Sequence, residues 1–330
     1  MKQILVTGGT GFLGSHLVEQ LRAAESDARL RLLCRGPSPW DAEPTVEVVR
    51  GDITSPEDVD RALVGVDEAY HTVGVVVGER QDTELVFRVR VEGVRNLCEA
   101  ALKHGVRKLV VVSESSAIGV DRQPVAHHEH SGYRPDLYGD WPMRRSGMMA
   151  DQLVTSYFAQ HGLPVVVVNP SHMLGPGGQR SSTRQVAWFL NGRLPLIPPG
   201  GMNVVDVRDV AAAMIVAMRV AKPGERYLLG AANWSFHTLA KNVARVAGVR
   251  ARTLRLPLTL SLVVTRIMRR LPDSVARSFP LDATTLAMGS LYWYCDSSKA
   301  RRELGFRPRH PLLTLKDTVD DLRRRGEVRA

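Results

Sequence analysis

Short apolar runs alternate with amphipathic segments along the first half of the chain. Apolar and β-branched residues follow one another in the segments predicted as strands, at residues 4–6, 30–34, 46–49, 69–73, 109–112 and 165–168. Apolar residues recur every three or four positions in the segments predicted as helices, at residues 12–24, 57–63, 85–104 and 148–160. Repeated strand–helix units of this kind predict an α/β fold with a Rossmann-type doubly wound parallel sheet.

The pattern changes after residue 170. Proline and glycine cluster at residues 175–178 and 194–201, and a last helix is predicted at residues 313–325. Between them, short strands and helices follow without regular alternation. We therefore expect a first domain of residues 1–170, completed by segments that return from the C-terminal half. A smaller C-terminal α/β domain would comprise residues 171–330.

The composition is that of an ordinary globular protein. Hydrophobic residues make up 44% and charged residues 24% of the 330 residues, which excludes a disordered or collagen-like chain. The cysteines Cys34, Cys98 and Cys295 have neither disulfide-framework nor zinc-site spacing, so we expect reduced, buried thiols. The chain opens with a strand pattern rather than a signal peptide and has no apolar run of membrane-spanning length, so we expect a cytoplasmic protein.

The net charge of +10 is concentrated toward the C-terminus. Residues 241–330 hold 19 lysines and arginines against 8 aspartates and glutamates, so the whole excess lies in the last quarter of the chain. A basic surface attracts nucleic acid, anionic lipid or anionic substrates. These arginines are scattered over predicted helices, without a zinc-finger pattern or interleaved aromatic residues, so we expect no nucleic-acid partner.

The segment TGGTGFLG, residues 7–14, lies between the first predicted strand and the first predicted helix. Gly8 permits the tight turn, Gly11 lets a pyrophosphate approach the backbone, and Gly14 lets the helix pack closely on the strand. The helix N-terminus offers N–H groups and its positive dipole end to the phosphates. The alternative is a glycine-rich turn without a ligand. The predicted dinucleotide-binding residues in and beyond this turn are Gly8, Thr10, Gly11, Phe12, Leu13, Gly14 and Pro170.

Residues after the second and third strands bear on which dinucleotide binds. Arg35 follows the second strand, where an acidic residue would favour NAD, and its charge suits the 2′-phosphate of NADP instead. Asp52 and Ile53 follow the third strand, where Asp52 can accept from the adenine amino group and Ile53 can pack on the ring. We expect NADP, with NAD as the alternative, and a small-molecule substrate bound by the second domain.

Six segments of the chain, in this order, resemble the motifs of one protein family: TGGTGFLG, GDIT, VEGVRNLCEAA, VNPSHMLGPG, NVVDVRDVAAA and DSSKARRELGFRPR. In these segments the chain resembles the extended short-chain dehydrogenase/reductase superfamily, or NAD-dependent epimerases/dehydratases, and the resemblance covers nearly the whole chain. The nearest group looks like dihydroflavonol-4-reductase-like proteins and hopanoid-associated sugar epimerases. The resemblance implies oxidoreductase or epimerase chemistry with a nicotinamide cofactor.

The resemblance also implies a catalytic tetrad, which this chain lacks. The family uses Tyr as acid/base, Lys to lower the pKa of Tyr, Ser to hold the substrate oxygen and Asn to support a proton relay. Matched by their neighbours, these four places hold Met143, Gly147, Glu114 and Arg90, and no Tyr-x-x-x-Lys occurs in the sequence. Hydride transfer to a carbonyl needs a proton for the developing alkoxide, and methionine cannot donate one.

Several residues are candidates for replacing the tetrad. Glu114 follows the fifth strand, where ligands bind in open α/β sheets, and could act as general acid or base. Arg90 could pair with Glu114 or hold an anionic group, and a purely structural Arg90–Glu114 pair is the alternative. Ser113 offers a hydroxyl. Tyr138 could be a displaced acid, although a tyrosine at the solvent edge is the simpler interpretation.

Two further features concern histidine. His172 follows the sixth strand and could contact the substrate or hydrogen-bond behind it. The run of residues 127–130, HHEH, looks like a metal cluster, but adjacent residues do not point the same way and no partner motif is evident. We therefore predict no metal site.

Residues 258–271 combine apolar residues at helical spacing with arginines. Three interpretations stay open: a helix packed on the second domain, a lid over a hydrophobic substrate, and a contact with a membrane surface. A homodimer is also considered as a partner.

Three functions fit the sequence. The first is an NADP(H)-binding enzyme with a repurposed site, which would catalyse a non-redox isomerisation, elimination or cyclisation of a small organic substrate. The second is a conventional NADP-dependent reductase or epimerase with a displaced proton donor. The third is a non-catalytic cofactor-binding regulator or scaffold. We expect the first, although fold alone does not decide function.

Overall fold

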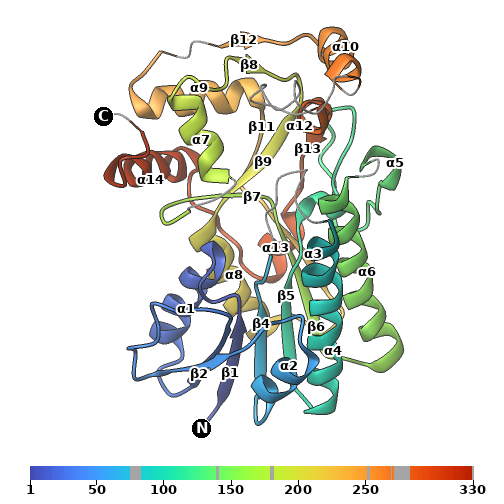
Figure 1. Cartoon of the computed structure of the whole chain (residues 1–330), viewed down its shortest axis with the longest axis vertical. Coiled ribbons are helices and arrows are strands. Elements are labelled where there is room, and N and C mark those ends of the chain that lie inside the picture. Colours follow the sequence, from blue (N-terminus) through green and yellow to red (C-terminus); the bar gives the residue numbers. More distant parts are fainter. Residues whose placement is uncertain are drawn as a thin grey trace.

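The computed structural model describes residues 1–74, 83–138, 141–178, 182–250, 253–268, 270 and 283–328; the side chains of residues 138, 284 and 285 are not described. A large sheet with helices on both faces forms the end of the molecule that carries the N-terminus (Figure 1). A smaller sheet with its own helices forms the opposite end.

The large sheet has seven strands, all parallel, in the order β10-β6-β5-β4-β1-β2-β3. This confirms the predicted α/β class with a Rossmann-type parallel sheet. The edge strand β10 comes from the second half of the chain. The strands are β1 (Gln3–Thr7), β2 (Arg29–Cys34), β3 (Val46–Arg50), β4 (Glu68–His71), β5 (Lys108–Val112), β6 (Val165–Pro170) and β10 (Arg226–Leu229).

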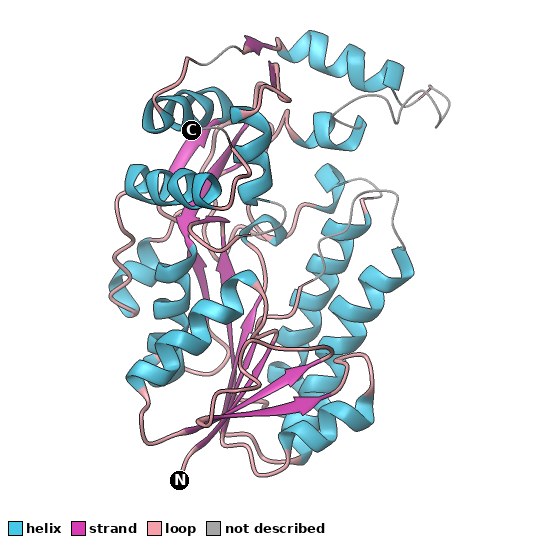
Figure 2. Ribbon diagram, turned by 60° about the vertical axis from the view of Figure 1, so that its left-hand side comes forward, coloured by secondary structure: helices cyan, strands magenta, loops and turns pink. Residues whose placement is uncertain are grey.

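Helices cover both faces of this sheet, which explains why its strands are apolar on both sides (Figure 2). On β1, Ile4 and Val6 pack in the core layer of α1 and α8, whereas Leu5 packs in the layer of α2, α4 and α6. The covering helices are α1 (Phe12–Ala24), α2 (Pro56–Leu63), α3 (Thr83–Phe87), α4 (Gly93–Lys103), α6 (Pro142–His161) and α8 (Val207–Val220).

Two predicted helices differ from the structure in ways that concern the site. The helix predicted at residues 85–104 contains a π-helical turn, Arg88–Glu92, between α3 and α4. Helix α6 begins at Pro142 rather than Met148, because proline fits the first turn of a helix, where its missing N–H would have no partner. The π turn carries Arg90, and the added first turn of α6 carries Met143 to Gly147.

The smaller sheet has four strands centred on β9, which pairs with β11, β13 and β7. Helices α7, α9 and α14 share one apolar cluster with it. A separate two-stranded pair joins β8 and β12. The strands are β7 (His172–Leu174), β8 (Leu196–Ile197), β9 (Gly201–Asp206), β11 (Ala232–Ser235), β12 (Leu254–Arg255) and β13 (Tyr292–Trp293). The helices are α5 (Pro135–Tyr138), α7 (Ser182–Leu190), α9 (Phe236–Ala247), α10 (Leu258–Met268), α12 (Ala283–Met288), α13 (Ser298–Glu303) and α14 (Pro311–Arg324).

Helix α10 does not bury the apolar stripe that its sequence suggested. Leu260, Val263 and Ile267 are 48%, 53% and 55% exposed, while Ser261, Thr265 and Met268 face the protein. Met268 of the stripe is nevertheless buried in a small cluster with Leu256 and Leu286, and Val264 packs partly against it, so the helix packs on the second domain with only part of its apolar residues. Leu271, the last residue of the predicted segment, lies outside the described residues. No helix in the described part of the chain is long and apolar enough to cross a membrane.

Candidate functional site

The glycine turn between β1 and α1 has the shape that a dinucleotide phosphate requires. Gly8 has a φ of 79°, a conformation that favours glycine. A Cβ at Gly14 would collide with the carbonyl oxygen of Gly8, so only glycine lets α1 pack this closely. A Cβ at Gly11 would meet only the Gly8 oxygen, at 3.2 Å, among the described residues, so Gly11 borders open space. These positions therefore fit a phosphate at the N-terminus of α1.

The other residues predicted in this turn differ in exposure. Thr10 and Gly11 are exposed, Phe12 is half-buried and Leu13 is buried in the core, so Leu13 can offer a ligand its backbone N–H but not its side chain. Sequence reasoning missed Trp40, whose Nε1 donates to the Gly9 oxygen at 3.2 Å. Trp40 stands alone in the loop after β2, where no periodicity marks it.

Arg35 and Asp52 lie together at the carboxyl ends of β2 and β3. The Nη1 atom of Arg35 is 3.9 Å from Oδ2 of Asp52, and the Arg35 side chain is 70% exposed. Asp52 Oδ1 accepts hydrogen bonds from the backbone and hydroxyl of Thr54, both at 2.9 Å. Ile53 is buried against Gly93 of α4. The sequence predicted the adenosine end of the cofactor at this place. The structure has an exposed arginine here, beside a carboxylate of which one oxygen already accepts two hydrogen bonds.

Two of the residues that the sequence matched to the family's tetrad, Arg90 and Glu114, form a network of three charged side chains with Arg144. Oε2 of Glu114 lies 2.8 Å from Nη1 of Arg144, and Oε1 lies 3.2 Å from Nη2 of Arg90. Arg90 also donates to the backbone oxygen of Met143 at 2.6 Å. Two guanidinium groups thus enclose one carboxylate, and the network carries a net charge of +1.

Gly147 makes this network possible. A Cβ at residue 147 would lie closer than 3.0 Å to Oε1 of Glu114, nearer than real Cβ contacts come, and 3.2 Å from Nη2 of Arg90. The carboxylate therefore occupies space that any larger residue at 147 would need.

The protonation of Glu114 follows from its neighbours. Burial raises the pKa of Glu114, but the charges of Arg144 and Arg90 and their hydrogen bonds outweigh burial and hold the pKa below its ordinary value. Glu114 is therefore ionised at neutral pH. It can accept a proton from a substrate, but it cannot serve as the proton donor that a carbonyl reductase requires.

Arg144 is held between two tryptophan rings. Its guanidinium lies 4.8 Å from the ring centroid of Trp141 and 4.8 Å from that of Trp293. It also donates to the hydroxyl of Ser116. Sequence reasoning missed Arg144 as a site residue, because its partners Glu114 and Trp293 are distant in sequence and no motif links them.

The remaining candidates lie around this network. Ser113 follows β5 and Ser171 follows β6; their buried hydroxyls have no hydrogen-bond partner among the described residues. His172 begins β7, and burial, followed by the charge of Arg144, lowers its pKa to about 4, so its imidazole is neutral at physiological pH. Pro170 is buried at the end of β6. The side chain of Tyr138 lies outside the described part of the structure.

A second network of polar side chains, centred on Asp151, lies next to the network of Glu114, Arg90 and Arg144. Asp151 is buried and lies 2.6 Å from Nη2 of Arg226, and it accepts from the Tyr133 hydroxyl at 2.7 Å. The amide nitrogen of Asn169 joins the two networks, because it donates to Asp151 at 3.1 Å and to the backbone oxygen of Glu114 at 3.2 Å. Asn169 therefore fixes the backbone that carries Glu114.

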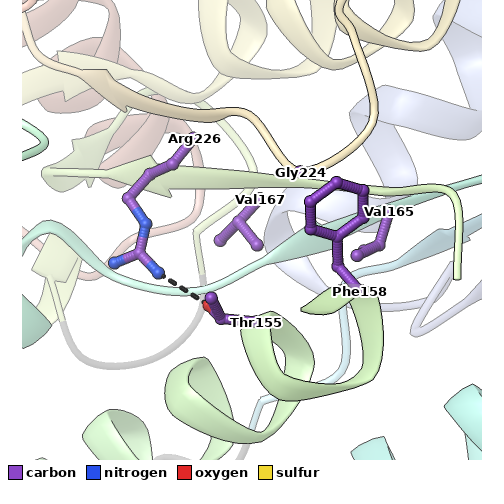
Figure 3. A pocket seen from close by; sticks show the side chains of 6 residues that line it. All are labelled: Thr155, Phe158, Val165, Val167, Gly224 and Arg226. Atoms are coloured by element: carbon purple, nitrogen blue, oxygen red, sulfur yellow. Dashed lines mark hydrogen bonds between the residues drawn. The ribbon is translucent and has the colours of Figure 1, made fainter. Parts of the chain in front are cut away.

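A small cavity of about 40 Å³ lies beside Arg226 (Figure 3). Arg226 donates to the Thr155 hydroxyl at its rim, at 3.1 Å. Phe158, Val165 and Val167 supply apolar walls. A cavity of this volume is too small for a drug-sized ligand, which needs roughly 300 Å³ or more, so it is not the substrate site.

The side chains of residues 127–130 have different neighbours and do not form one cluster. His127 is buried near Asp121, Glu129 accepts from the backbone of Leu228, and the rings of His128 and His130 lie 6.1 Å apart. Across the described ranges of the chain, no three histidine, cysteine, aspartate or glutamate side chains gather as metal ligands.

The strand order and the glycine turn define a dinucleotide-binding protein of the Rossmann class. Sequence comparison specifies the family: residues 4–230 match the model of the NAD dependent epimerase/dehydratase family, and the chain belongs to this family. The family is part of the extended short-chain dehydrogenase/reductase superfamily, as the sequence motifs predicted.

Relatives resemble the chain over its whole length. It is 30% identical to a putative dihydroflavonol 4-reductase of Synechocystis, with 98% of this chain and 95% of that protein covered. It is 31% identical to sterol demethylase protein B of Methylococcus capsulatus, with 98% and 99% covered. The crystal structure of gox2253 superimposes with a TM-score of 0.86 at 30% identity and covers both chains completely. The family's description names NAD as the cofactor on which its epimerases and dehydratases depend.

Proposed function

We propose that this protein is an NADP(H)-binding enzyme that catalyses a non-redox conversion of a small carbonyl compound, with Glu114 as the general base. The enclosure of Glu114 by Arg90 and Arg144 carries this proposal. Isomerisation, elimination and cyclisation next to a carbonyl can all begin with removal of a proton, which needs a carboxylate that is already ionised. Reduction needs a proton donor, for which a carboxyl group with a lowered pKa is unsuited.

The surrounding charges support the same proposal. Removal of a proton next to a carbonyl builds negative charge on the carbonyl oxygen. A network with a net positive charge at the end of β5 favours that charge, and Ser113 and the neutral His172 offer further hydrogen bonds. Because its pKa is held low, Glu114 is a weaker base than an ordinary glutamate.

The cofactor belongs to this proposal as a bound group. Gly8, Gly11 and Gly14 would hold its pyrophosphate, and Arg35 and Asp52 would hold its adenosine end. When bound, the nicotinamide supplies a site for hydride transfer; in the proposed reaction it undergoes no net oxidation or reduction. The substrate would lie between the end of β5 and the part of the chain after residue 170.

Exchange in deuterated solvent tests the proposal. Flavonoid and sterol ketones, chosen from the names of the relatives, would be incubated with the enzyme and NADP or NADPH. We expect deuterium to enter next to the carbonyl, seen by proton NMR, without a net change in nicotinamide absorbance. Glu114→Gln should slow this exchange by ~10²–10⁴. Glu92→Gln, at an exposed glutamate on the neighbouring π turn, is the matched control.

The variants must be compared as folded proteins. The assay is therefore run below the unfolding transition of Glu114→Gln, with NADPH binding as the measure of an intact fold. Stoichiometric oxidation of NADPH by the wild-type protein would contradict the proposal and favour a reductase with a displaced donor. If the rate of deuterium exchange were the same in Glu114→Gln as in the wild type, Glu114 would not be the general base. The network of Arg90, Glu114 and Arg144 would then be structural.

A further inference from the structure

The outer surface of helix α10 is apolar and exposed. Six large apolar side chains of β12, α10 and the residues between them are 48% to 71% exposed. They are Leu254, Leu258, Leu260, Leu262, Val263 and Ile267, and we call them the α10 surface. The helix lies at the end of the molecule opposite the N-terminus (Figure 1). Exposed apolar side chains gathered in this way mark a contact surface rather than ordinary solvent-facing protein.

The helix is oriented opposite to an ordinary surface helix. A helix that merely covers a core turns its apolar residues inward and its polar residues to water. In α10 the buried positions include Ser261 and Thr265, and Ser261 bonds to the Ser290 hydroxyl at 2.9 Å. The leucines and the isoleucine point away from the protein instead. The protein buries Met268 and part of Val264, and it leaves the other large apolar side chains of this helix about half exposed.

The segment of the sequence that forms the α10 surface carries charge of one sign. No aspartate or glutamate occurs between Glu225 and Asp273, a stretch that holds nine lysines and arginines. Arg255, Arg266 and Arg270 are exposed beside the apolar residues. A partner for this surface therefore has an apolar interior and an anionic face.

A second copy of the chain does not have that chemistry. A two-fold contact would place the same surface on itself, and the arginines would then face arginines. An anionic lipid surface fits better, because it offers hydrocarbon to the leucines and phosphate or carboxylate headgroups to the arginines. The long arginine side chains can reach the headgroups while the apolar residues insert.

We propose that the α10 surface docks this protein on an anionic membrane as an interfacial helix that does not span the bilayer. This inference is independent of the chemistry at Glu114. It gives a role to the exposed positive charges of Arg255, Arg266 and Arg270.

Co-sedimentation of the full-length protein with vesicles tests the proposal. Vesicles of phosphatidylcholine alone are compared with vesicles that also contain phosphatidylserine. We expect binding to the anionic vesicles that weakens as salt is raised, because salt screens the arginines. Leu262→Ser with Ile267→Ser should lower the partition coefficient about tenfold or more, since both side chains would leave the acyl boundary.

The chain supplies a matched control for this double variant. Val64 and Leu313 are each 55% exposed, as are Leu262 and Ile267, but they lie on other surfaces. Val64→Ser with Leu313→Ser should leave vesicle binding unchanged. Arg255→Glu with Arg266→Glu should weaken binding to anionic vesicles about thirtyfold, since each arginine near the surface contributes about 1 kcal/mol. Arg301→Glu with Arg302→Glu on α13 is the control for charge.

A positional probe shows whether α10 itself enters the interface. The three native cysteines are buried, so a dye that reports polarity can be attached selectively to Leu262→Cys, or to Leu313→Cys as a control. We expect a blue shift with anionic vesicles only at position 262. Absence of vesicle binding, or equal losses in the Leu262/Ile267 and Val64/Leu313 variants, would overturn the proposal. A dimer in sedimentation velocity that Leu262→Ser with Ile267→Ser abolishes would assign the surface to a second copy instead.

Discussion

Glu114 occupies space that a side chain at position 147 would need: a Cβ there would lie closer than 3.0 Å to its Oε1 atom. A side chain at position 147, including the lysine that the family resemblance implies there, and this carboxylate therefore exclude each other in their present places. Glycine at 147 and glutamate at 114 are coupled, and Arg90 and Arg144 supply the charge that a partly buried carboxylate requires.

Because of this coupling, Gly147→Ala should change the free energy of unfolding in opposite directions in the wild-type protein and in a Glu114→Ser variant. Gly147→Ala should destabilise the wild-type protein by about 1–3 kcal/mol, because the ion pairs must shift to admit a methyl group. In a Glu114→Ser background the same change should stabilise α6 by up to ~1 kcal/mol, since alanine favours a helix over glycine. Urea unfolding of the four proteins measures both effects.

Gly36 provides the control for that cycle, because a Cβ there meets nothing within 4 Å. Gly36→Ala should change the free energy of unfolding by less than about 0.5 kcal/mol in either background. Equal effects of Gly147→Ala in both backgrounds would show that Glu114 and residue 147 do not compete for space.

Glu114 should also make stability depend on pH. Its pKa is lowered in the folded protein from an ordinary value of 4.5, so its stabilising effect is complete above pH 4.5 and is lost as pH falls through the folded-state pKa. At pH 7, Glu114→Gln should cost on the order of 3 kcal/mol, because it leaves two guanidinium groups without their counter-ion. The difference should shrink toward acidic pH.

Thermal unfolding of wild-type and Glu114→Gln protein between neutral and acidic pH checks this. The exposed Glu92→Gln variant should follow the wild-type curve. A constant gap between the wild-type and Glu114→Gln curves at every pH would mean that the carboxylate charge contributes nothing.

Dinucleotide binding should depend on the open space at Gly11. Gly11→Val would place a branched side chain where the phosphate approaches, and we expect binding of NADPH to be lost while the melting temperature stays near that of the wild type. Calorimetric titration measures the binding. Retained binding by Gly11→Val would refute the assignment of the turn.

The choice between NADP and NAD should depend on Arg35. A charge-assisted contact to a phosphate contributes ~1.5–3 kcal/mol, so Arg35→Ala should weaken NADPH binding by about one to two decades and leave NADH nearly unchanged. Arg29→Ala removes an exposed arginine from the other end of the same strand and should alter neither. If Arg35→Ala weakened both cofactors equally, the 2′-phosphate contact would be disproved.

Much of the large sheet could be predicted because its signals are local. Apolar runs mark its strands, and the glycine spacing marks the turn before α1. The N-cap at Ser55, whose hydroxyl accepts from the Asp58 backbone at 3.2 Å, is equally local. The reacting centre was predicted in part, since Arg90 and Glu114 could be paired by family position.

Other features depend on contacts that the sequence does not encode locally. Arg144 becomes a site residue only because α6 begins early and Trp293 packs on it from far along the chain. The spacing of apolar residues in α10 predicted a helix, but periodicity does not tell which side faces the protein. The π turn around Arg90 depends on packing against α6, and no residue in it marks a change of helical geometry.

Trp293, stacked on Arg144, has a consequence for the order of assembly. The rest of the charged network is in place once α6 has formed, but its last aromatic wall belongs to β13, near the end of the chain. During synthesis on the ribosome, Arg144 would have Glu114, Ser116 and Trp141 beside it while the 149 residues up to and including Trp293 are still being added. We expect this contact to be among the later ones to form, because it closes a loop of that length. The glycine turn at residues 7–14 would be synthesised long before Trp293, which completes the site around Arg144.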